Sequence, residues 1–225
     1  QTASLAGEAP ELLWTVFDHA GPFTAAGIIQ PVDGLYPADE FVESVILDGS
    51  TWGIPISSGN HLMLLYNKSL VPDPPETTDE LIAIGKSLTR GDMYGFVYND
   101  TEPFWLVPWL GGFGGRVFEA DGVTPSLDTP AMVATLQFLH DLEFVHGIVP
   151  AEADYGTADT LFKEGKAAMI VNGDWSLGDY RAVLGDDFGV APLPTVSSTG
   201  RRPAPYTSGK MFMIADGVAG RTLDV

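Results

Sequence analysis

The sequence has no cysteine in its 225 residues. Disulfide bonds, thiolate metal sites and thiol nucleophiles are therefore excluded. Long hydrophobic runs are also missing, because no stretch approaches the roughly 20 apolar residues that span a bilayer. Internal repeats and low-complexity segments are absent as well. What remains is a chain whose 45% hydrophobic and 11% aromatic content is typical of a folded globular protein.

Basic residues are scarce, since 11 lysines and arginines stand against 30 aspartates and glutamates, for a formal net charge of −19. Proteins bind nucleic acids largely by neutralising phosphates with lysine and arginine. We therefore expect no nucleic-acid partner, and an anionic membrane surface is unfavourable for the same reason. A net charge of this size keeps a protein soluble and separate from its own copies, which predicts a monomer.

Metal, cofactor and nucleophile signatures are also missing. The four histidines, His19, His61, His140 and His146, show no metal-ligand spacing. The glycine-rich segment 111–115 lacks the Lys-Ser/Thr pair that completes a phosphate-binding loop, and no G-x-S-x-G occurs. We predict no metal, no cofactor and no catalytic residue.

Strand-like and helix-like segments alternate along the chain, a pattern that favours an α/β fold. Strands are predicted at 10–17, 52–56, 61–67, 94–99, 167–171, 188–191 and 210–215. Shorter helices are predicted at 21–29, 103–109 and 157–164. The composition of residues 57–60, Ser-Ser-Gly-Asn, predicts a turn, and the glycines of 111–115 predict the end of a helix.

Two further helix starts have capping signatures. Thr77 with Glu80 fits a capping box, and Thr129 followed by a proline begins the clearest helix of the chain. Gly147 is placed to end that helix. Its predicted buried face consists of Met132, Leu136, Leu139 and Leu142.

Several segments occur in a characteristic order. They are Gly53–Ile56, His61–Lys68, Val71–Leu81, Glu102–Trp105, Gly111–Gly115, Leu161–Met169, and Val171–Trp175 followed by Phe188–Pro194. Each segment is weak evidence by itself. The ordered set resembles the maltodextrin-binding branch of the extracellular solute-binding proteins, family 1, over nearly the whole chain.

The resemblance implies the type II periplasmic-binding-protein fold, in which two α/β lobes are joined by hinge strands. It also implies that this sequence is a central portion, truncated at both ends. Residues 1–56 and 207–225 would form part of the first lobe, and residues 57–206 most of the second.

The function that the resemblance implies is that of the extracytoplasmic substrate-binding component of an ABC importer. Such a protein captures a sugar, here an oligosaccharide of maltodextrin type, by hinge closure and does no chemistry on it. Its partners would be the sugar and the membrane permease subunits. Its location would be the periplasm or the cell surface, with a lipid anchor as an option in the full-length protein.

A sugar site combines aromatic faces, which cover the C–H faces of the ring, with polar groups that satisfy its hydroxyls. Glu102 lies beside Phe104 and Trp105, one acceptor with two rings. Trp175 follows a predicted core strand and would emerge at the carboxyl edge of a sheet, where open α/β folds bind ligands. Capping by Glu102 and core packing of the rings are the plainer interpretations, and the resemblance favours ligand binding.

The resemblance also implies four further ligand-binding residues. Asp18 and His19 align with a charged pair that binds ligand hydroxyls in this branch, although His19 replaces an arginine. Asn60 stands where the branch has a glutamate, and Tyr155 lies in a segment that faces the cleft.

Two alternatives stay open at this point. A glycoside-active enzyme would need two carboxylates across the scissile bond. Glu102 and Asp174 are candidates, but among 30 acidic residues such a pair decides nothing. A binding protein for a non-sugar solute such as a polyamine would suit the acidic charge.

Overall fold

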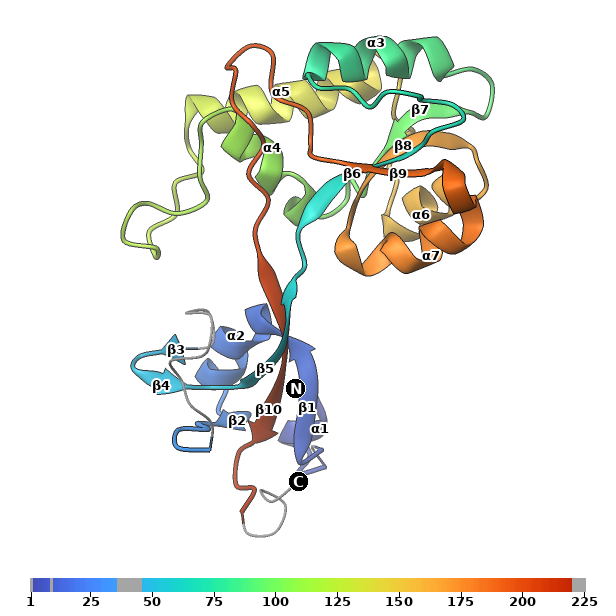
Figure 1. Cartoon of the computed structure of the whole chain (residues 1–225). Coiled ribbons are helices and arrows are strands. Elements are labelled where there is room, and N and C mark those ends of the chain that lie inside the picture. Colours follow the sequence, from blue (N-terminus) through green and yellow to red (C-terminus); the bar gives the residue numbers. More distant parts are fainter. Residues whose placement is uncertain (1, 9, 36–45, 220–225) are drawn as a thin grey trace. The chain divides into compact units, whose positions relative to one another are not determined.

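The computed structural model describes residues 2–8, 10–35 and 46–219, which fall into two compact units (Figure 1). Unit 1 comprises Gln1–Asn60 and Thr207–Val225, and unit 2 comprises His61–Tyr206. The chain therefore passes from unit 1 to unit 2 after Asn60 and returns at Thr207. Across the described residues, every helix is too short or too polar to cross a bilayer.

Unit 1 is built around strand β10 (Ser208–Ala215), which pairs antiparallel with three other strands. These are β1 (Leu12–Val16), β2 (Ile29–Gln30) and β5 (Ile54–Gly59). The other elements of the unit are α1 (Thr2–Leu5), η1 (Phe17–His19), α2 (Ala20–Ala25), β3 (Ile46–Leu47) and β4 (Ser50–Thr51).

The core of unit 1 lies on one face of this sheet. Met211 and Met213 of β10 are fully buried and pack with Phe17 and Ile29. Side chains alternate between the two faces of a strand, and Trp14 of β1 points away from this core with 62% of its surface exposed. The period-2 pattern thus separates a buried face from an open one.

The turn predicted at residues 57–60 is wrong, because residues 57–59 continue strand β5. Ser57 pairs with Lys210 and Gly59 with Ser208 in the register of β10. The chain changes conformation one residue later, at Asn60, whose φ is +61°. Backbone hydrogen bonds to a strand far along the chain outweigh the weak strand preference of serine and glycine.

Unit 2 contains a four-stranded sheet with the order β7-β8-β6-β9. The strands are β6 (Leu62–Asn67), β7 (Tyr94–Val97), β8 (Ala167–Gly173) and β9 (Phe188–Ala191). Strands β7 and β8 are parallel, while β6 is antiparallel to both β8 and β9. All seven residues of β8 are buried, as expected for a central strand with both faces covered.

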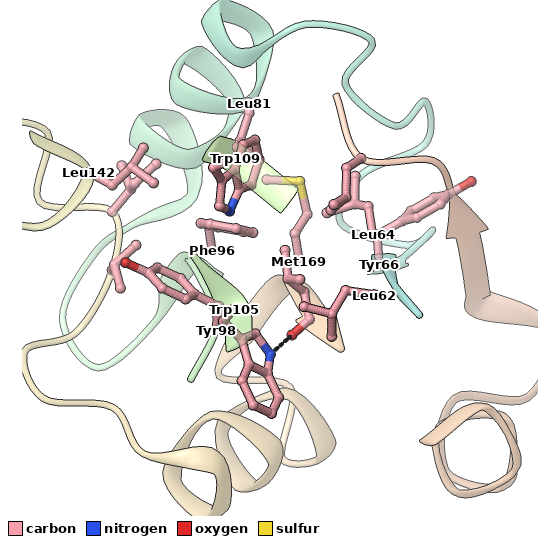
Figure 2. Close-up of a cluster of buried hydrophobic side chains, with 14 of the residues drawn as sticks. Leu62, Leu64, Tyr66, Leu81, Phe96, Tyr98, Trp105, Trp109, Leu142 and Met169 are labelled. Atoms are coloured by element: carbon pink, nitrogen blue, oxygen red, sulfur yellow. Dashed lines mark hydrogen bonds between the residues drawn. The ribbon is translucent and has the colours of Figure 1, made fainter. Parts of the chain in front are cut away.

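Helices cover both faces of this sheet (Figure 1). One face carries α3 (Thr78–Leu88), α4 (Val107–Gly112) and α5 (Pro130–Phe144), and the other carries α6 (Tyr155–Lys163) and α7 (Leu177–Leu184). Short 3₁₀ turns η4 (Pro103–Trp105), η5 (Asp174–Ser176) and η6 (Gly185–Asp187) link these elements. Adjacent residues of β6 face opposite layers, since Leu64 packs under α3 and α5 and Leu65 packs with α6 and α7. Figure 2 shows the larger of the two cores.

Both predicted helix caps are present, with one change. The Thr77 hydroxyl accepts the backbone N–H of Glu80 at 3.3 Å, and Thr129 does the same for Met132 at 3.2 Å. The Glu80 carboxylate accepts the N–H of Glu76 at 2.7 Å instead of that of Thr77. The return bond of the capping box is therefore displaced by one residue.

One expectation about the helices of unit 2 is wrong. Leu136 was expected on the buried face of α5 but is 52% exposed, while Leu142 is fully buried. The end of a helix predicted within residues 111–115 is confirmed, because Gly111 and Gly112 are the last two residues of α4 and Phe113 is its C-cap. A Cβ on Gly111 would lie 2.7 Å from the Cβ of Ala204, so these glycines permit close packing of α4 against residues 203–204.

Candidate functional site

Aromatic side chains gather where the parallel strands β7 and β8 end. They come from η4, from the start of α6 and from η5, which directly follows β8. Ring centroids lie 5.2 Å apart for Phe104 and Trp105, 6.0 Å for Trp105 and Tyr155, and 6.5 Å for Trp105 and Trp175. Phe104 and Trp175 are 6.4 Å apart. We call Phe104, Trp105, Tyr155 and Trp175 the aromatic cluster.

Trp105 forms the buried base of the aromatic cluster. Only 5% of its surface is exposed. Its indole N–H donates to the backbone carbonyl of Val171 in β8 at 3.3 Å (Figure 2). This bond ties η4 to the central strand and satisfies the buried donor of Trp105.

Tyr155 and Trp175 form the more accessible part of the cluster. The indole N–H of Trp175 donates to the hydroxyl of Tyr155 at 3.1 Å. Tyr155 is 37% exposed and Trp175 is partly buried. Helix α6 begins at Tyr155 because the Asp154 carboxylate caps it, accepting the N–H of Thr157 at 2.8 Å.

Glu102 precedes η4 but makes no side-chain cap hydrogen bond, and its side chain is exposed. It lines a cavity of about 630 Å³ between the chain after β7 and helix α5. Other carboxylates on this cavity are Asp100, Glu143 and Glu152. None of the rings of the aromatic cluster lines this cavity. Glu102 is therefore close to Phe104 and Trp105 in sequence, but in space it lines the acidic cavity.

The carboxylates of this cavity repel one another. Burial raises the pKa of Asp100, and the negative charges of Glu152 and Asp154 raise it further. A hydrogen bond from the backbone N–H of Ala153 partly offsets this rise by lowering the pKa. Burial also raises the pKa of Glu143, and the charges of Asp100 and Glu152 contribute. No lysine or arginine lines the cavity. Its interior is therefore unfavourable for a further anion.

The remaining predicted site residues, Asp18, His19 and Asn60, lie in unit 1. The carboxylate of Asp18 accepts a hydrogen bond from the hydroxyl of Ser208 at 3.0 Å. The His19 ring hydrogen-bonds to the Thr15 hydroxyl and stacks on Phe23 with centroids 5.1 Å apart. Asp18 and His19 are adjacent in η1, and both are exposed. The structure thus places Asp18 and His19 side by side in unit 1, whereas in unit 2 it brings the four rings of the aromatic cluster together and leaves Glu102 on the acidic cavity.

Metal chemistry finds no support among the residues that the structure describes. No group of three or more histidine, aspartate or glutamate side chains there is arranged to hold an ion. His61 lines a separate hollow with Met63 and Arg202, away from any carboxylate cluster. The arrangement at the aromatic cluster suits recognition of a neutral, partly apolar molecule.

The chain also matches a known protein family. A model described as "bacterial extracellular solute-binding protein" matches residues 1–221. The chain belongs to this family. Its members named below are binding proteins, and none of their names describes an enzyme.

Two curated relatives of this solute-binding protein illustrate the match. A maltotriose-binding protein of Pyrococcus abyssi is 30% identical over 94% of the chain and 48% of the relative. A maltodextrin-binding protein of Bacillus subtilis is 28% identical over 91% of the chain and 52% of the relative. The chain thus spans about half the length of the curated relatives that it matches.

Solved structures agree with the fold. A maltose/maltodextrin-binding domain from Bdellovibrio bacteriovorus, bound to maltotriose, is 40% identical with a TM-score of 0.92, covering 99% of this chain and 61% of that one. The maltotriose-binding protein of Thermus thermophilus, also bound to maltotriose, is 30% identical with a TM-score of 0.87, covering 99% and 62%. The α/β periplasmic-binding-protein-like fold predicted from the sequence is confirmed.

Sequence reasoning missed the acidic cavity and the contacts that hold this solute-binding protein's rings in place. Asp100 follows strand β7 closely and could have been noticed as a polar residue at a strand end. Glu143 comes from α5, and nothing in the local sequence places it beside Asp100. In the sequence, Gly173 is only one residue of the Val171–Trp175 segment, and its contact with Trp175 depends on side-chain packing.

Proposed function

We propose that this protein is the substrate-binding component of an ABC importer and that its ligand is an oligosaccharide of maltodextrin type, bound and released unchanged. The aromatic cluster is the observation that carries the proposal. It presents Tyr155, Trp175 and Phe104 at the carboxyl edge of the sheet, with Trp105 packed behind them. Names of the relatives support the ligand class, including maltotriose-binding and maltodextrin-binding proteins.

The chemistry of the ligand follows from the chemistry of the cluster. Sugar rings carry apolar C–H faces that gain contact area on indole and phenol rings. Their hydroxyls need hydrogen-bond partners, because an unpaired buried hydroxyl costs about 1–3 kcal/mol. Glu102, two residues before Phe104, can supply an acceptor, and Asp18, His19 and Asn60 can supply further polar groups from unit 1. An uncharged ligand also avoids the cost of approaching a chain of net charge −19 as an anion.

The wider role is part of the same proposal. One relative is named a maltooligosaccharide ABC transporter solute-binding lipoprotein of Streptococcus pneumoniae, 25% identical over 94% of this chain. We propose membrane permease subunits as partners, action as a monomer outside the cytoplasm, and membrane attachment through a lipid in the complete protein. Units 1 and 2 correspond in this proposal to part of the first lobe and most of the second. Closure of the lobes on the ligand stays a prediction.

The deciding experiment is a titration of the protein with maltose, maltotriose, cellobiose and spermidine, followed by calorimetry and by chromatography of the sugars. We expect saturable binding of maltotriose with a change in tryptophan fluorescence and no hydrolysis products. Shorter oligosaccharides in the chromatogram would show hydrolysis, and the proposal of a binding protein would give way to that of a glycoside-active enzyme. A response to spermidine alone would indicate that the ligand is a polyamine and that the acidic cavity is its binding site.

A further inference from the structure

Gly173 is the last residue of strand β8 and stands two positions before Trp175. Its backbone angles are φ −96° and ψ 172°, in the extended region that every L-residue adopts readily. The backbone therefore does not require glycine here. Another reason must explain why this fully buried strand end carries no side chain.

The reason is the indole of Trp175, which lies directly over the Cα of Gly173. A Cβ at position 173 would be 2.0 Å from Cζ3, 2.2 Å from Cη2 and 2.3 Å from Cε3 of that ring. Carbon atoms in favourable contact lie about 3.5–4.0 Å apart. Any side chain on residue 173 would consequently displace the six-membered ring by more than an ångström.

The backbone at this point cannot yield easily. The N–H of Gly173 donates to the side-chain oxygen of Asn172 at 2.8 Å, and the carbonyl of Gly173 accepts the hydroxyl of Ser176 at 2.7 Å. Asn172 is held in turn, because its amide donates to the buried hydroxyl of Tyr180 at 2.7 Å. These bonds are buried, and breaking one costs about 1–3 kcal/mol. The ring of Trp175 is therefore the part that would move.

Displacement of that ring would also disturb its partners. The opposite edge of the indole, at Nε1, is bonded to Tyr155, and the rings of Phe104 and Trp105 stand 6.4 and 6.5 Å away. Because Gly173 has no side chain, the indole can pack directly against the end of strand β8 while its Nε1–H still donates to the Tyr155 hydroxyl.

We propose that Gly173 is a positioning residue whose missing side chain determines where the Trp175 indole rests and which face it presents to a sugar. The inference about sugar binding rests on the proposed function, whereas the inference about the ring does not. Gly173→Ala would preserve the strand conformation and the exposed polar groups while shifting one ring.

The test compares Gly173→Ala with Gly178→Ala. Gly178 lies in α7, and a Cβ there has nothing within 4 Å, so it is a matched control. The readout without sugar is the indole N–H resonance of Trp175 among the protein's five tryptophans, assigned with Trp175→Phe. We expect Gly173→Ala to shift that resonance and to weaken maltotriose binding at least tenfold, with Gly178→Ala unchanged in both. An unshifted resonance in Gly173→Ala would overturn the proposal.

A double-mutant cycle separates ring placement from general damage. In a Trp175→Ala background the ring is gone, so Gly173→Ala should cost no further affinity and no further stability. If Gly173→Ala alone does not fold, the double variant should fold again. Equal losses in both backgrounds would overturn the positioning role. If the unmodified protein binds no sugar, the proposed function fails, and the indole resonance alone still decides the role of Gly173.

Discussion

The hydroxyl of Ser208 donates a hydrogen bond of 3.0 Å to the carboxylate of Asp18, 190 positions earlier in the chain. The bond links the first residue of β10 to the turn η1 that follows β1, its antiparallel neighbour. Asp18 is exposed and Ser208 is buried, so the serine orients a carboxylate at the surface. A proposed ligand-binding group in unit 1 is thus held by the strand at which the chain re-enters that unit.

Ser208→Ala should release the Asp18 side chain. We expect maltotriose affinity to fall about two- to tenfold and the free energy of unfolding to fall by about 0.5–1.5 kcal/mol, the usual net value of one hydrogen bond. Calorimetric titration and urea unfolding measure the two effects. Ser58→Ala, at an exposed serine of β5, should change neither quantity. Full affinity in Ser208→Ala would show that Asp18 needs no such support.

Glu102→Gln should weaken maltotriose binding at least tenfold without lowering the melting temperature. The side chain is exposed and caps no helix, so its removal leaves the packing of η4 intact. Calorimetry gives the affinity and differential scanning fluorimetry gives the melting temperature. Glu76→Gln, an exposed glutamate on the same unit, is the control for the loss of one negative charge. Equal maltotriose affinity in the two variants would show that Glu102 is not part of the binding site.

Tyr180→Phe should destabilise unit 2 by about 1–3 kcal/mol. The buried amide of Asn172 donates to the Tyr180 hydroxyl at 2.7 Å, and the substitution leaves that donor without its acceptor. Urea unfolding followed by circular dichroism measures the loss. Tyr206→Phe provides the comparison, because Tyr206 is 46% exposed and its substitution leaves no buried donor such as the Asn172 amide unpaired. A loss below 0.5 kcal/mol in Tyr180→Phe would contradict this account.

The acidic cavity should contribute stability to the folded protein as the pH falls through the raised pKa values of Asp100 and Glu143. The pKa values of Asp100 and Glu143 are raised above their ordinary values of 3.8 and 4.5, chiefly by burial. The folded state then binds more protons than the unfolded state, so this contribution is present at low pH and is lost as the pH rises through the raised pKa values.

Glu143→Gln tests this pH dependence directly. The variant should melt at a higher temperature than the unmodified protein at pH 7 and should show a smaller gain in melting temperature as the pH falls through the raised pKa values. Asp121, whose pKa is lowered to about 2 by hydrogen bonds from Thr124 and Val123, acts in the opposite direction, and its contribution is lost as the pH falls through 3.8 towards 2. An identical pH profile for Glu143→Gln would show that burial and the neighbouring carboxylates do not raise the pKa of Glu143 significantly.

Gly95→Ala should be strongly destabilising, by about 1–3 kcal/mol or more. A Cβ on Gly95 of β7 would lie 2.3 Å from the Cα and the carbonyl oxygen of Gly85 in α3, and backbone atoms cannot swing aside. Chemical denaturation measures the effect. Gly178→Ala should instead be neutral or stabilise by about 0.5–1 kcal/mol, because alanine is favoured over glycine in a helix. A tolerated Gly95→Ala would mean that α3 can move away from the sheet.

Local signals were sufficient for much of the fold. The helices that begin after Thr77 and Thr129 were predicted where they occur, because a cap depends on atoms within one turn of the chain. Strands β6, β8 and β9 were predicted from short apolar runs of the correct length. The family resemblance was carried by the same local segments, which is why it could be noticed without a structure.

Tertiary contacts decided the remainder. Residues 57–59 became a strand because β10 offered hydrogen-bond partners some 150 positions away in sequence. Leu136 was placed on the wrong face because hydrophobic spacing on α5 does not say which stripe meets the sheet.

By itself, the sequence determined the fold class, most elements and the family to which the chain belongs, since periodicity, caps and motif order are properties of neighbouring residues. The tertiary structure alone brought Ser208 to Asp18, Glu143 to Asp100, and the Trp175 indole to its resting place over Gly173. The physical reason is that burial, charge repulsion and close packing depend on distances in space. Those distances are decided only when strands and helices from separate parts of the chain pack together.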